Sequence, residues 1–260
     1  MSAGIRVQEV VPYSLLARGY DQVMDYVDYE AWARYVHRLI RRFCPEAQTV
    51  LELGCGTGSL ALALQPLGPY RYRASDRSAA MLAVAREKAA RAGSSVVFEQ
   101  ADFSDYRVAE PVDVVLLLFD GLNYLLEPEG VRALFRCTWQ ALRPGGVFIF
   151  DQSTPMNSLE HEADFDDAGE TDAFRYVRRS YYDPERRLHT TIFELEVDGK
   201  VYRERHLERA YTLEEIRAWL RAEGFRIEAA YDNFSLRPAT ARSERIHWVV
   251  RRPDQPQARP

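Results

Sequence analysis

Three glycines and two carboxylates in the first third of the chain have the types and spacing of a ligand-binding turn. Gly54, Gly56 and Gly58 follow an apolar run that ends in Glu52, and a second apolar segment ends in Asp76. Alternate glycines between a strand and a helix let a ligand approach the backbone closely. A carboxylate about 20 residues beyond such a turn is placed to bind a ribose diol. The pattern predicts a binding edge for a ligand that contains a ribose.

Two later apolar segments also end in polar and aromatic residues. The first ends at Ala101-Asp102-Phe103, whose acidic and aromatic pair suits the exocyclic amine and the ring face of a purine. The second, residues 112–118, is followed by residues 119–124, which carry several polar groups. Because open α/β sheets bind ligands at the carboxyl ends of their strands, these groups are expected at the same edge as the glycine turn.

Together these residues resemble the class I S-adenosylmethionine-dependent methyltransferases, and most closely the small-molecule type with a β-rich insertion before the last helix. The resemblance covers roughly residues 13–250 and is specific for the cofactor, not for the methyl acceptor. The segments and residues that carry it are 52–58, Asp76, 101–103, 119–124 and 142–146.

The resemblance implies that S-adenosylmethionine is the cofactor and S-adenosylhomocysteine its product. Glu52 and the glycine backbone would serve the methionine end, Asp76 the ribose, and Asp102 with Phe103 the adenine. The family's N-terminal segment folds over the cofactor as a lid, so we expect tyrosines from it at the ligand. The full set expected to bind the cofactor is Tyr13, Tyr20, Glu52, Gly54, Cys55, Gly56, Gly58, Asp76, Arg77, Met81, Ala101, Asp102, Phe103, Phe119, Asp120 and Asn123.

The residue types leave other interpretations open. An NAD-dependent oxidoreductase would need Gly-x-Gly-x-x-Gly/Ala, and Ser59 stands at the third small position, while Asp76 suits either cofactor. A non-catalytic S-adenosylmethionine-binding sensor or partner subunit would carry the same motifs. Asp76 could also cap the next helix, although Ser78 is available for that. Asp102 could simply start a loop, and the N-terminal tyrosines could be core residues.

Composition excludes several classes of partner. The chain has 260 residues, 47% of them hydrophobic, and a net charge of −5 without a dominant basic stripe, which argues against nucleic acid. It has neither an apolar run of about 20 residues nor a secretory signal pattern, so we expect no membrane. Three cysteines and five histidines lack metal-ligand or disulfide spacing, so no metal is expected. We expect a cytoplasmic monomer or homodimer that acts on a small-molecule methyl acceptor.

Alternating segments predict an α/β fold: a Rossmann-like, doubly wound, mostly parallel seven-stranded sheet with an inserted antiparallel β-meander. The expected sheet strands are 49–53, 70–75, 95–100, 112–118, 147–151, 225–231 and 245–251, and the expected meander strands are 174–183, 187–197 and 200–210. The expected helices are 58–65, 78–92, 128–142 and one that a capping box opens at Thr212.

We divide the chain into four parts. They are an N-terminal helical lid (1–45), a cofactor-binding core (46–155 and 211–251), an inserted antiparallel β cap (156–210) and a disordered tail (252–260). Residues 1–12 are expected to be loose, and the lid has no predicted strand to anchor it. The cap is expected to roof the acceptor site, because functional insertions vary a pocket without disturbing the scaffold.

The last strand of the meander offers candidate catalytic residues. Strand alternation places Tyr202, Glu204, His206 and Glu208 on one face. If that face points inward, Glu204 and His206 could orient an amine or hydroxyl, and His206 could accept its proton near neutral pH; the opposite orientation satisfies alternation equally well. The expected reaction is in-line displacement by a nitrogen, oxygen or carbon nucleophile, for which alignment matters most and a general base is optional.

Overall fold

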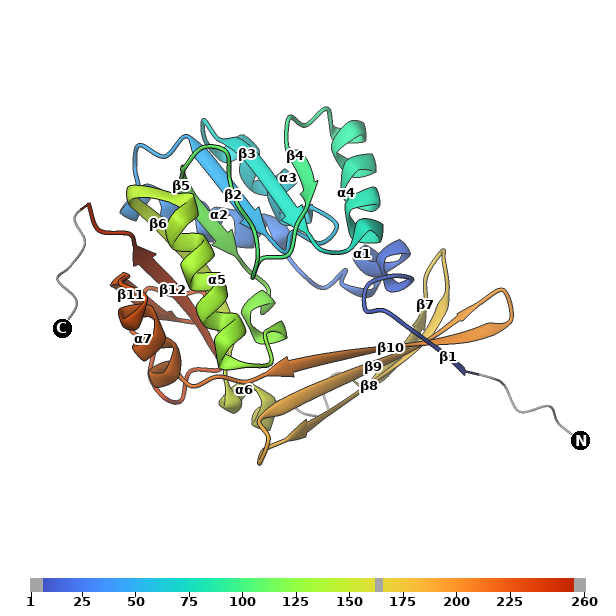
Figure 1. Cartoon of the computed structure of the whole chain (residues 1–260). Helices are drawn as coiled ribbons and strands as arrows, with labels where there is room; N and C mark the ends of the chain where they lie inside the picture. The colour runs from blue at the N-terminus through green and yellow to red at the C-terminus, as the bar shows by residue number, and fades with distance from the viewer. Residues whose placement is uncertain (1–6, 162–165, 255–260) are drawn as a thin grey trace, which may run out of the picture.

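The computed structural model describes residues 7–161 and 166–254 and contains two β-sheets (Figure 1). The larger, central sheet has seven strands in the order β11-β12-β6-β5-β2-β3-β4. Neighbours from β4 to β6 are parallel, and β12 and β11 are antiparallel additions. Its strands are β2 (Thr49–Leu53), β3 (Arg71–Asp76), β4 (Val97–Gln100), β5 (Val112–Leu117), β6 (Leu142–Ser153), β11 (Arg226–Asp232) and β12 (Arg245–Arg251).

Helices cover both faces of the central sheet and enclose two apolar cores. On one face lie α2 (Tyr29–Phe43), α3 (Ser59–Leu64) and α4 (Ala79–Ala92), and on the other α5 (Pro128–Ala141) and α7 (Leu213–Ala222). Successive residues of β5 alternate between the two cores, so this strand is apolar on both sides, as expected for a covered parallel sheet. Short helices are α1 (Tyr20–Val23), α6 (Pro155–Glu160) and the 3₁₀ turns η1 (Leu16–Arg18), η2 (Gln65–Leu67) and η3 (Gly121–Tyr124).

The second sheet has five strands in the order β1-β10-β9-β8-β7. They are β1 (Val7–Val10), β7 (Asp167–Glu170), β8 (Arg175–Asp183), β9 (Leu188–Val197) and β10 (Lys200–Arg209). In Figure 1 the long ribbon of β8, β9 and β10 passes below the central sheet, and α1 lies between this ribbon and the central sheet. This arrangement sets one face of the ribbon against the carboxyl edge of the parallel strands.

The predicted fold class is confirmed, and the three meander strands lie within a residue of their predicted bounds. One expectation about the N-terminus is wrong. Residues 7–10 are not loose but form β1, which runs parallel to β10 and anchors the start of the chain to the second sheet. The missed signal is weak, because a four-residue edge strand that pairs with a strand about 190 positions away has no local turn to mark it.

Parts of other predictions lie outside the described residues: positions 1–6, positions 162–165 of the cap, and positions 255–260 of the tail. The described part of the tail is held, since the Arg252 guanidinium donates to the carbonyls of Trp139 and Leu142 at 2.9 and 2.6 Å. None of the helices in residues 7–161 and 166–254 is long and apolar enough to cross a membrane.

Candidate active site

The glycine turn lies at the point where the strand order of the central sheet reverses. β2 has β3 on one side and β5 on the other, and such a switch point is where open α/β sheets bind ligands. Gly54, Gly56 and Gly58 all have left-handed φ angles, of 62°, 56° and 74°. A Cβ on Gly58 would lie 2.9 Å from the Phe98 ring, whereas a Cβ on Gly56 would meet no atom within 4 Å. Gly58 therefore serves packing, while Gly56 leaves its backbone open to approach.

Asp76 ends β3 beside this turn. Its two carboxylate oxygens accept the N–H groups of Gly56 and Ser78, each at 2.8 Å. Ser78, not Asp76, caps α4, because its hydroxyl accepts the N–H of Met81. Burial raises the pKa of Asp76, and the two backbone hydrogen bonds oppose that rise. The capping alternative for Asp76 is therefore removed, and its carboxylate stays on the turn that it shares with Gly56.

Asp102 and Phe103 follow β4 and approach the same turn. One oxygen of Asp102 accepts the N–H and hydroxyl of Ser104 at 2.9 and 2.7 Å, which fixes the loop start. The other oxygen lies 3.8 Å from Arg77, whose side chain is largely exposed. A Cβ on Gly54 would lie 3.8 Å from the Phe103 ring. Asp102 thus keeps the loop role with one oxygen, and its other oxygen faces Arg77, while Phe103 lies against the glycine turn.

Several other expected cofactor residues are buried in the core beneath the turn. Glu52 is 4% exposed and accepts the Tyr72 hydroxyl at 2.7 Å; burial raises its pKa to about 8. Burial also raises the pKa of the Cys55 thiol, which packs in a hydrophobic core and does not have the environment of a reactive cysteine. Met81 is fully buried as well, and Ala101 donates its N–H to the Asp76 carbonyl. These residues support the turn from behind.

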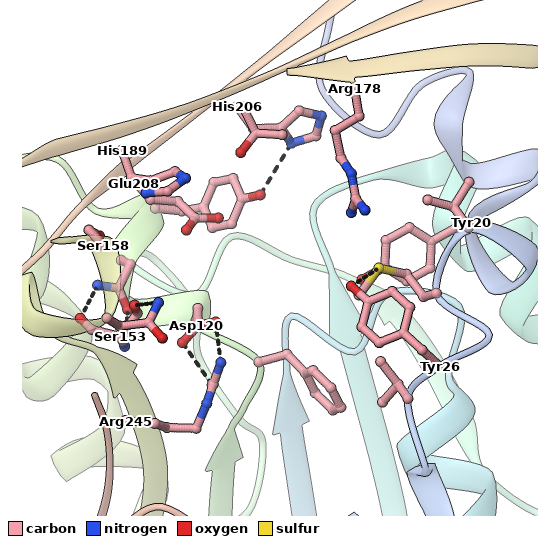
Figure 2. A pocket seen from close by; sticks show the side chains of 18 of the residues that line it. Tyr20, Tyr26, Asp120, Ser153, Ser158, Arg178, His189, His206, Glu208 and Arg245 are labelled. Atoms are coloured by element: carbon pink, nitrogen blue, oxygen red, sulfur yellow. Dashed lines mark hydrogen bonds and ion pairs between the residues drawn. The ribbon is translucent and has the colours of Figure 1, made fainter. Parts of the chain in front are cut away.

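A cavity of about 530 Å³ separates the carboxyl edge of the central sheet from the second sheet (Figure 2). It is enclosed by the N-terminal segment (residues 11–24), the start of α2, η3, the end of β6 and the start of β12. Its aromatic wall consists of Tyr13, Tyr20, Tyr26, Trp32, Phe119, Tyr124, Phe193 and Phe234. Its polar wall includes Asp120, Asn123, Ser153, Asn157, Ser158, Arg178, His189, Thr191, His206, Glu208 and Arg245.

Phe119 and Asp120 both have left-handed φ angles of 60°, which is unusual for residues with side chains. Such strain gathers at functional sites. The conformation stacks Phe119 on Trp32 at a centroid distance of 4.0 Å and turns Asp120 toward Arg245. Asn123 also lines the cavity, but its amide is engaged with backbone groups of Ser153 and Arg209 at 2.8 to 3.0 Å. Asn123 therefore holds η3 in place.

One arginine and three carboxylates form a charge cluster at one end of the cavity. Arg245 binds both oxygens of Asp120, at 2.8 and 2.7 Å, and also pairs with Asp151. Burial raises the pKa of Asp151 to about 7, and the Asp120 charge adds to the rise against the effect of Arg245. Burial and Asp120 likewise raise the pKa of Glu208 to about 8. Arg245 is therefore surrounded by more acidic groups than it can neutralise, and two of them, Asp120 and Glu208, line the cavity.

The face of β10 that carries Glu204, His206 and Glu208 points inward. Glu204 and His206 are 0% and 3% exposed, and His206 and Glu208 line the cavity. In the register with β9, Glu208 faces His189 directly. The sheet therefore presents a polar inner face: in Figure 2 Glu208 and His189 lie on the side of Asp120 and Arg245, and the His206 ring contacts the Tyr124 hydroxyl.

Glu204 does not line the cavity; its carboxylate binds the N-terminal segment. It accepts the N–H groups of Tyr13, Leu15 and Leu16 at 2.6, 2.8 and 3.1 Å. Burial alone would raise its pKa, but hydrogen bonds from His206 and from these backbone groups outweigh burial and lower it. The Glu204 carboxylate therefore anchors the N-terminal segment. Because backbone N–H groups occupy both of its oxygens, it is not available for proton transfer to an acceptor.

His206 connects Glu204 to two tyrosines. Its Nε2 lies 3.4 Å from Glu204, its Nδ1 lies 3.2 Å from the Tyr124 hydroxyl, and that hydroxyl contacts the hydroxyl of Tyr13. Burial raises the pKa of both tyrosines, so they keep their protons at neutral pH. The chain of contacts leads from the N-terminal segment to the inner face of the second sheet and holds both at fixed positions.

The N-terminal segment is also fastened to the edge of the central sheet that carries the glycine turn. The Ser78 hydroxyl donates to the carbonyl of Tyr13 at 2.9 Å, and Lys88 pairs with Asp21 at 2.6 Å. Asp21 in turn accepts the Thr57 hydroxyl at 2.6 Å, next to the glycine turn. A segment joined to both the glycine turn and the second sheet closes the space between them.

Sequence reasoning missed several residues in and beneath the cavity wall, and the sequence pattern could have indicated two of them. Asp151 falls near the end of β6, just as Asp76 ends β3. Arg245 is the first residue of β12. Because β12 runs antiparallel to β6, Arg245 lies at the carboxyl edge of the parallel strands. His189, in contrast, is placed by its register with Glu208, which no local pattern shows.

Comparison with known proteins agrees with this geometry. A family model described as a methyltransferase domain matches residues 50–146. A putative methyltransferase of Geobacillus sp. is 28% identical over 250 residues, which cover 92% of this chain and 99% of the relative. The crystal structure of an S-adenosylmethionine-dependent methyltransferase from Clostridium acetobutylicum is 26% identical, with a TM-score of 0.78 over 90% of this chain and 96% of that one. This chain is a class I S-adenosylmethionine-dependent methyltransferase.

A third relative matches about half of this chain. The dTDP-4-amino-2,3,4,6-tetradeoxy-D-glucose N,N-dimethyltransferase of Saccharopolyspora spinosa is 32% identical over 127 residues, 48% of each chain. The cofactor is therefore S-adenosylmethionine, and neither the NAD-dependent oxidoreductase nor the non-catalytic binder is supported. The glycine turn fits this cofactor, because Gly56 leaves room beside it and the Asp76 carboxylate is held on the same turn.

Proposed function

We propose that the methyltransferase acts on an amine nitrogen of a small soluble acceptor held in the cavity between its two sheets. The observation that carries this proposal is the excess of acidic groups around Arg245: Asp120 and Glu208 line the cavity beside this arginine, and the buried Asp151 pairs with it from beneath the wall. The cavity's other arginine, Arg178, is held by both oxygens of Asp167 at 2.7 and 2.8 Å. An ammonium suits such a wall, whereas a carboxylate or phosphate would be repelled.

Aromatic side chains of the cavity support the same class of acceptor. Trp32 already holds one cation over its ring, since the Arg245 guanidinium lies 5.6 Å from the ring centroid, and the cavity rings of Tyr20 and Phe119 can attract a ligand cation in the same way. The amino-sugar relative from Saccharopolyspora transfers methyl groups to nitrogen, which agrees with an amine here. S-adenosylmethionine supplies an activated methyl group, so the protein's own residues have to align the acceptor, exclude water and keep its nitrogen unprotonated.

In this proposal each group of residues has a distinct part. Asp76, Gly56, Asp102 and Phe103 hold the donor at the glycine turn, with Tyr13 and Tyr20 above it. Arg245 positions Asp120, and Glu204 with His206 positions the N-terminal segment and Tyr124. We therefore assign Glu204 and His206 a positioning role, by which they shape the cavity without exchanging a proton with the acceptor.

The test is a methyl-transfer screen with labelled S-adenosylmethionine. The acceptor panel pairs small primary and secondary amines, including amino sugars, with the alcohols and carboxylic acids of the same shape. We expect label to pass to amines and not to their oxygen counterparts. Transfer to hydroxy acids or neutral sugars, with no amine methylated, would contradict the proposed acceptor class while leaving the family assignment intact.

A further inference from the structure

We propose that Glu208 binds the ammonium form of the acceptor and accepts the proton that its nitrogen must lose before methylation. This inference rests on the proposed amine acceptor and assigns its proton acceptor. Glu208 lines the cavity from β10, directly opposite His189 on β9 and within hydrogen-bonding reach of Tyr124. In Figure 2 its carboxylate extends from the second sheet into the cavity, toward Asp120.

The other carboxylates near the cavity are already engaged, and one of them, Asp28, caps α2 by accepting the N–H of Ala31 at 2.8 Å. Asp120 has both oxygens on Arg245. Asp151 is fully buried, pairs with the same arginine and accepts the N–H of Asp120. Glu204 is saturated by backbone donors. Within residues 7–161 and 166–254, no ion pair of Glu208 with a lysine or arginine nitrogen occurs within 4.0 Å, so its charge remains available to a ligand cation.

The groups that face Glu208 come from every element around it. Acidic Asp120 from the start of η3 and Asp151 from β6 disfavour its charged form, and Arg245 from β12 favours it. Tyr124 from η3, Tyr13 from the N-terminal segment, His206 on its own strand and His189 on β9 complete the surroundings. Burial and the acidic neighbours together raise the pKa of Glu208 to about 8, which suits a carboxylate that takes a proton from an amine.

The proton transfer is balanced within the complex. One N–H bond of the bound ammonium breaks, its electron pair stays on nitrogen, and an O–H bond forms on Glu208. The ammonium becomes a neutral amine with a free lone pair, and the carboxylate becomes a neutral acid. Because two opposite charges are neutralised in a partly desolvated site, burial favours the products of this transfer.

The proposal can be tested by calorimetry on the full-length protein saturated with S-adenosylhomocysteine, with cyclohexylamine as cationic probe and cyclohexanol as neutral counterpart. We expect the unmodified protein to bind cyclohexylamine more tightly, and Glu208→Gln to weaken that binding about tenfold or more without changing cyclohexanol binding. Near pH 7, binding should also release about one proton to the buffer, because a partly protonated Glu208 must ionise to hold the cation. Glu208→Gln should abolish this release.

Two further variants exclude a structural explanation. Glu208→Asp keeps the charge and should restore most of the preference for the amine. Glu228→Gln removes a half-buried carboxylate of β11 outside the cavity and should change nothing. Equal amine affinity in the unmodified protein and Glu208→Gln, or no preference for the amine at all, would overturn the role of Glu208. Failure of the acceptor screen alone would instead count against the proposed function.

Discussion

The glycine turn and the inner face of the second sheet border the same cavity but are built in different ways. At the turn, short stretches of sequence supply the groups, and backbone N–H donors bind a single carboxylate, Asp76. On the inner face, charged side chains are held by partners far away in sequence, as Glu204 is by the N-terminal segment and Asp120 by Arg245. In the proposed function, donor binding is therefore a local property of the chain, whereas acceptor binding depends on how distant segments assemble.

The largest expected effect comes from the glycines, which differ within the turn itself. Gly58→Ala combines a left-handed φ with a Cβ 2.9 Å from the Phe98 ring, so we expect it to lower the free energy of unfolding by about 2 to 5 kcal/mol. Gly56→Ala meets only the φ penalty and should lower it by about 1 to 2 kcal/mol while weakening S-adenosylhomocysteine binding. Urea unfolding measures the stability of both variants, and calorimetry measures S-adenosylhomocysteine binding to Gly56→Ala. Equal destabilisation by the two substitutions would contradict the separate roles of Gly58 in packing and Gly56 in ligand approach.

A second expected effect lies on the inner face. Glu204→Gln replaces a carboxylate that accepts three backbone N–H groups, so we expect it to lower the free energy of unfolding by about 2 to 4 kcal/mol. Since the pKa of Glu204 is lowered in the folded state, its contribution is complete above the unfolded pKa of about 4.3 and is lost as pH falls further. The gap between the variant and the unmodified protein in urea unfolding should therefore close below about pH 4; a gap that does not depend on pH would indicate packing alone.

A smaller effect of opposite sign is expected at Glu208. Its raised pKa means that the unfolded chain ionises first, so stability falls as pH rises from about 4 to about 8. Glu208→Gln removes this loss, and the ligand-free variant should become more stable than the unmodified protein by about 1 to 2 kcal/mol at pH 8 to 9. Thermal unfolding across this range measures the gap. A variant that is less stable at every pH would show that Glu208 is a structural residue.

The smallest expected effect concerns the segment that joins the two regions. S-adenosylhomocysteine should slow hydrogen exchange over residues 13–24, because Tyr13 and Asp21 are fastened to the cofactor edge. Exchange in β1 should change less, because it is already paired with β10. Unchanged exchange across residues 13–24, with a protected core, would mean that the segment is a fixed wall of the cavity and not a lid.

The same contrast explains what could be predicted from the sequence. Asp76, Asp102 and the glycines each follow a strand that an apolar run marks in the sequence, and Ser78 marks the start of the next helix. The position of the glycine turn and its neighbours could therefore be predicted. The pairing of β1 with β10 and the register of Glu208 with His189 depend on contacts between distant segments. Alternation correctly grouped Glu204, His206 and Glu208 on one face, but only the packed structure distinguishes the anchored carboxylate from the one at the cavity.

The most direct test of this division is a cross-comparison of two variants by calorimetry, Asp76→Ala and Glu208→Gln, each titrated with S-adenosylhomocysteine and with cyclohexylamine. Asp76→Ala should weaken S-adenosylhomocysteine binding by about 1 to 3 kcal/mol, because charge-assisted hydrogen bonds to the ribose are lost, and Glu208→Gln should leave it unchanged. Cyclohexylamine binding to protein saturated with S-adenosylhomocysteine should show the reverse pattern. If Asp76→Ala retains full S-adenosylhomocysteine affinity, or if each variant weakens both ligands equally, the separation of donor and acceptor sites is contradicted.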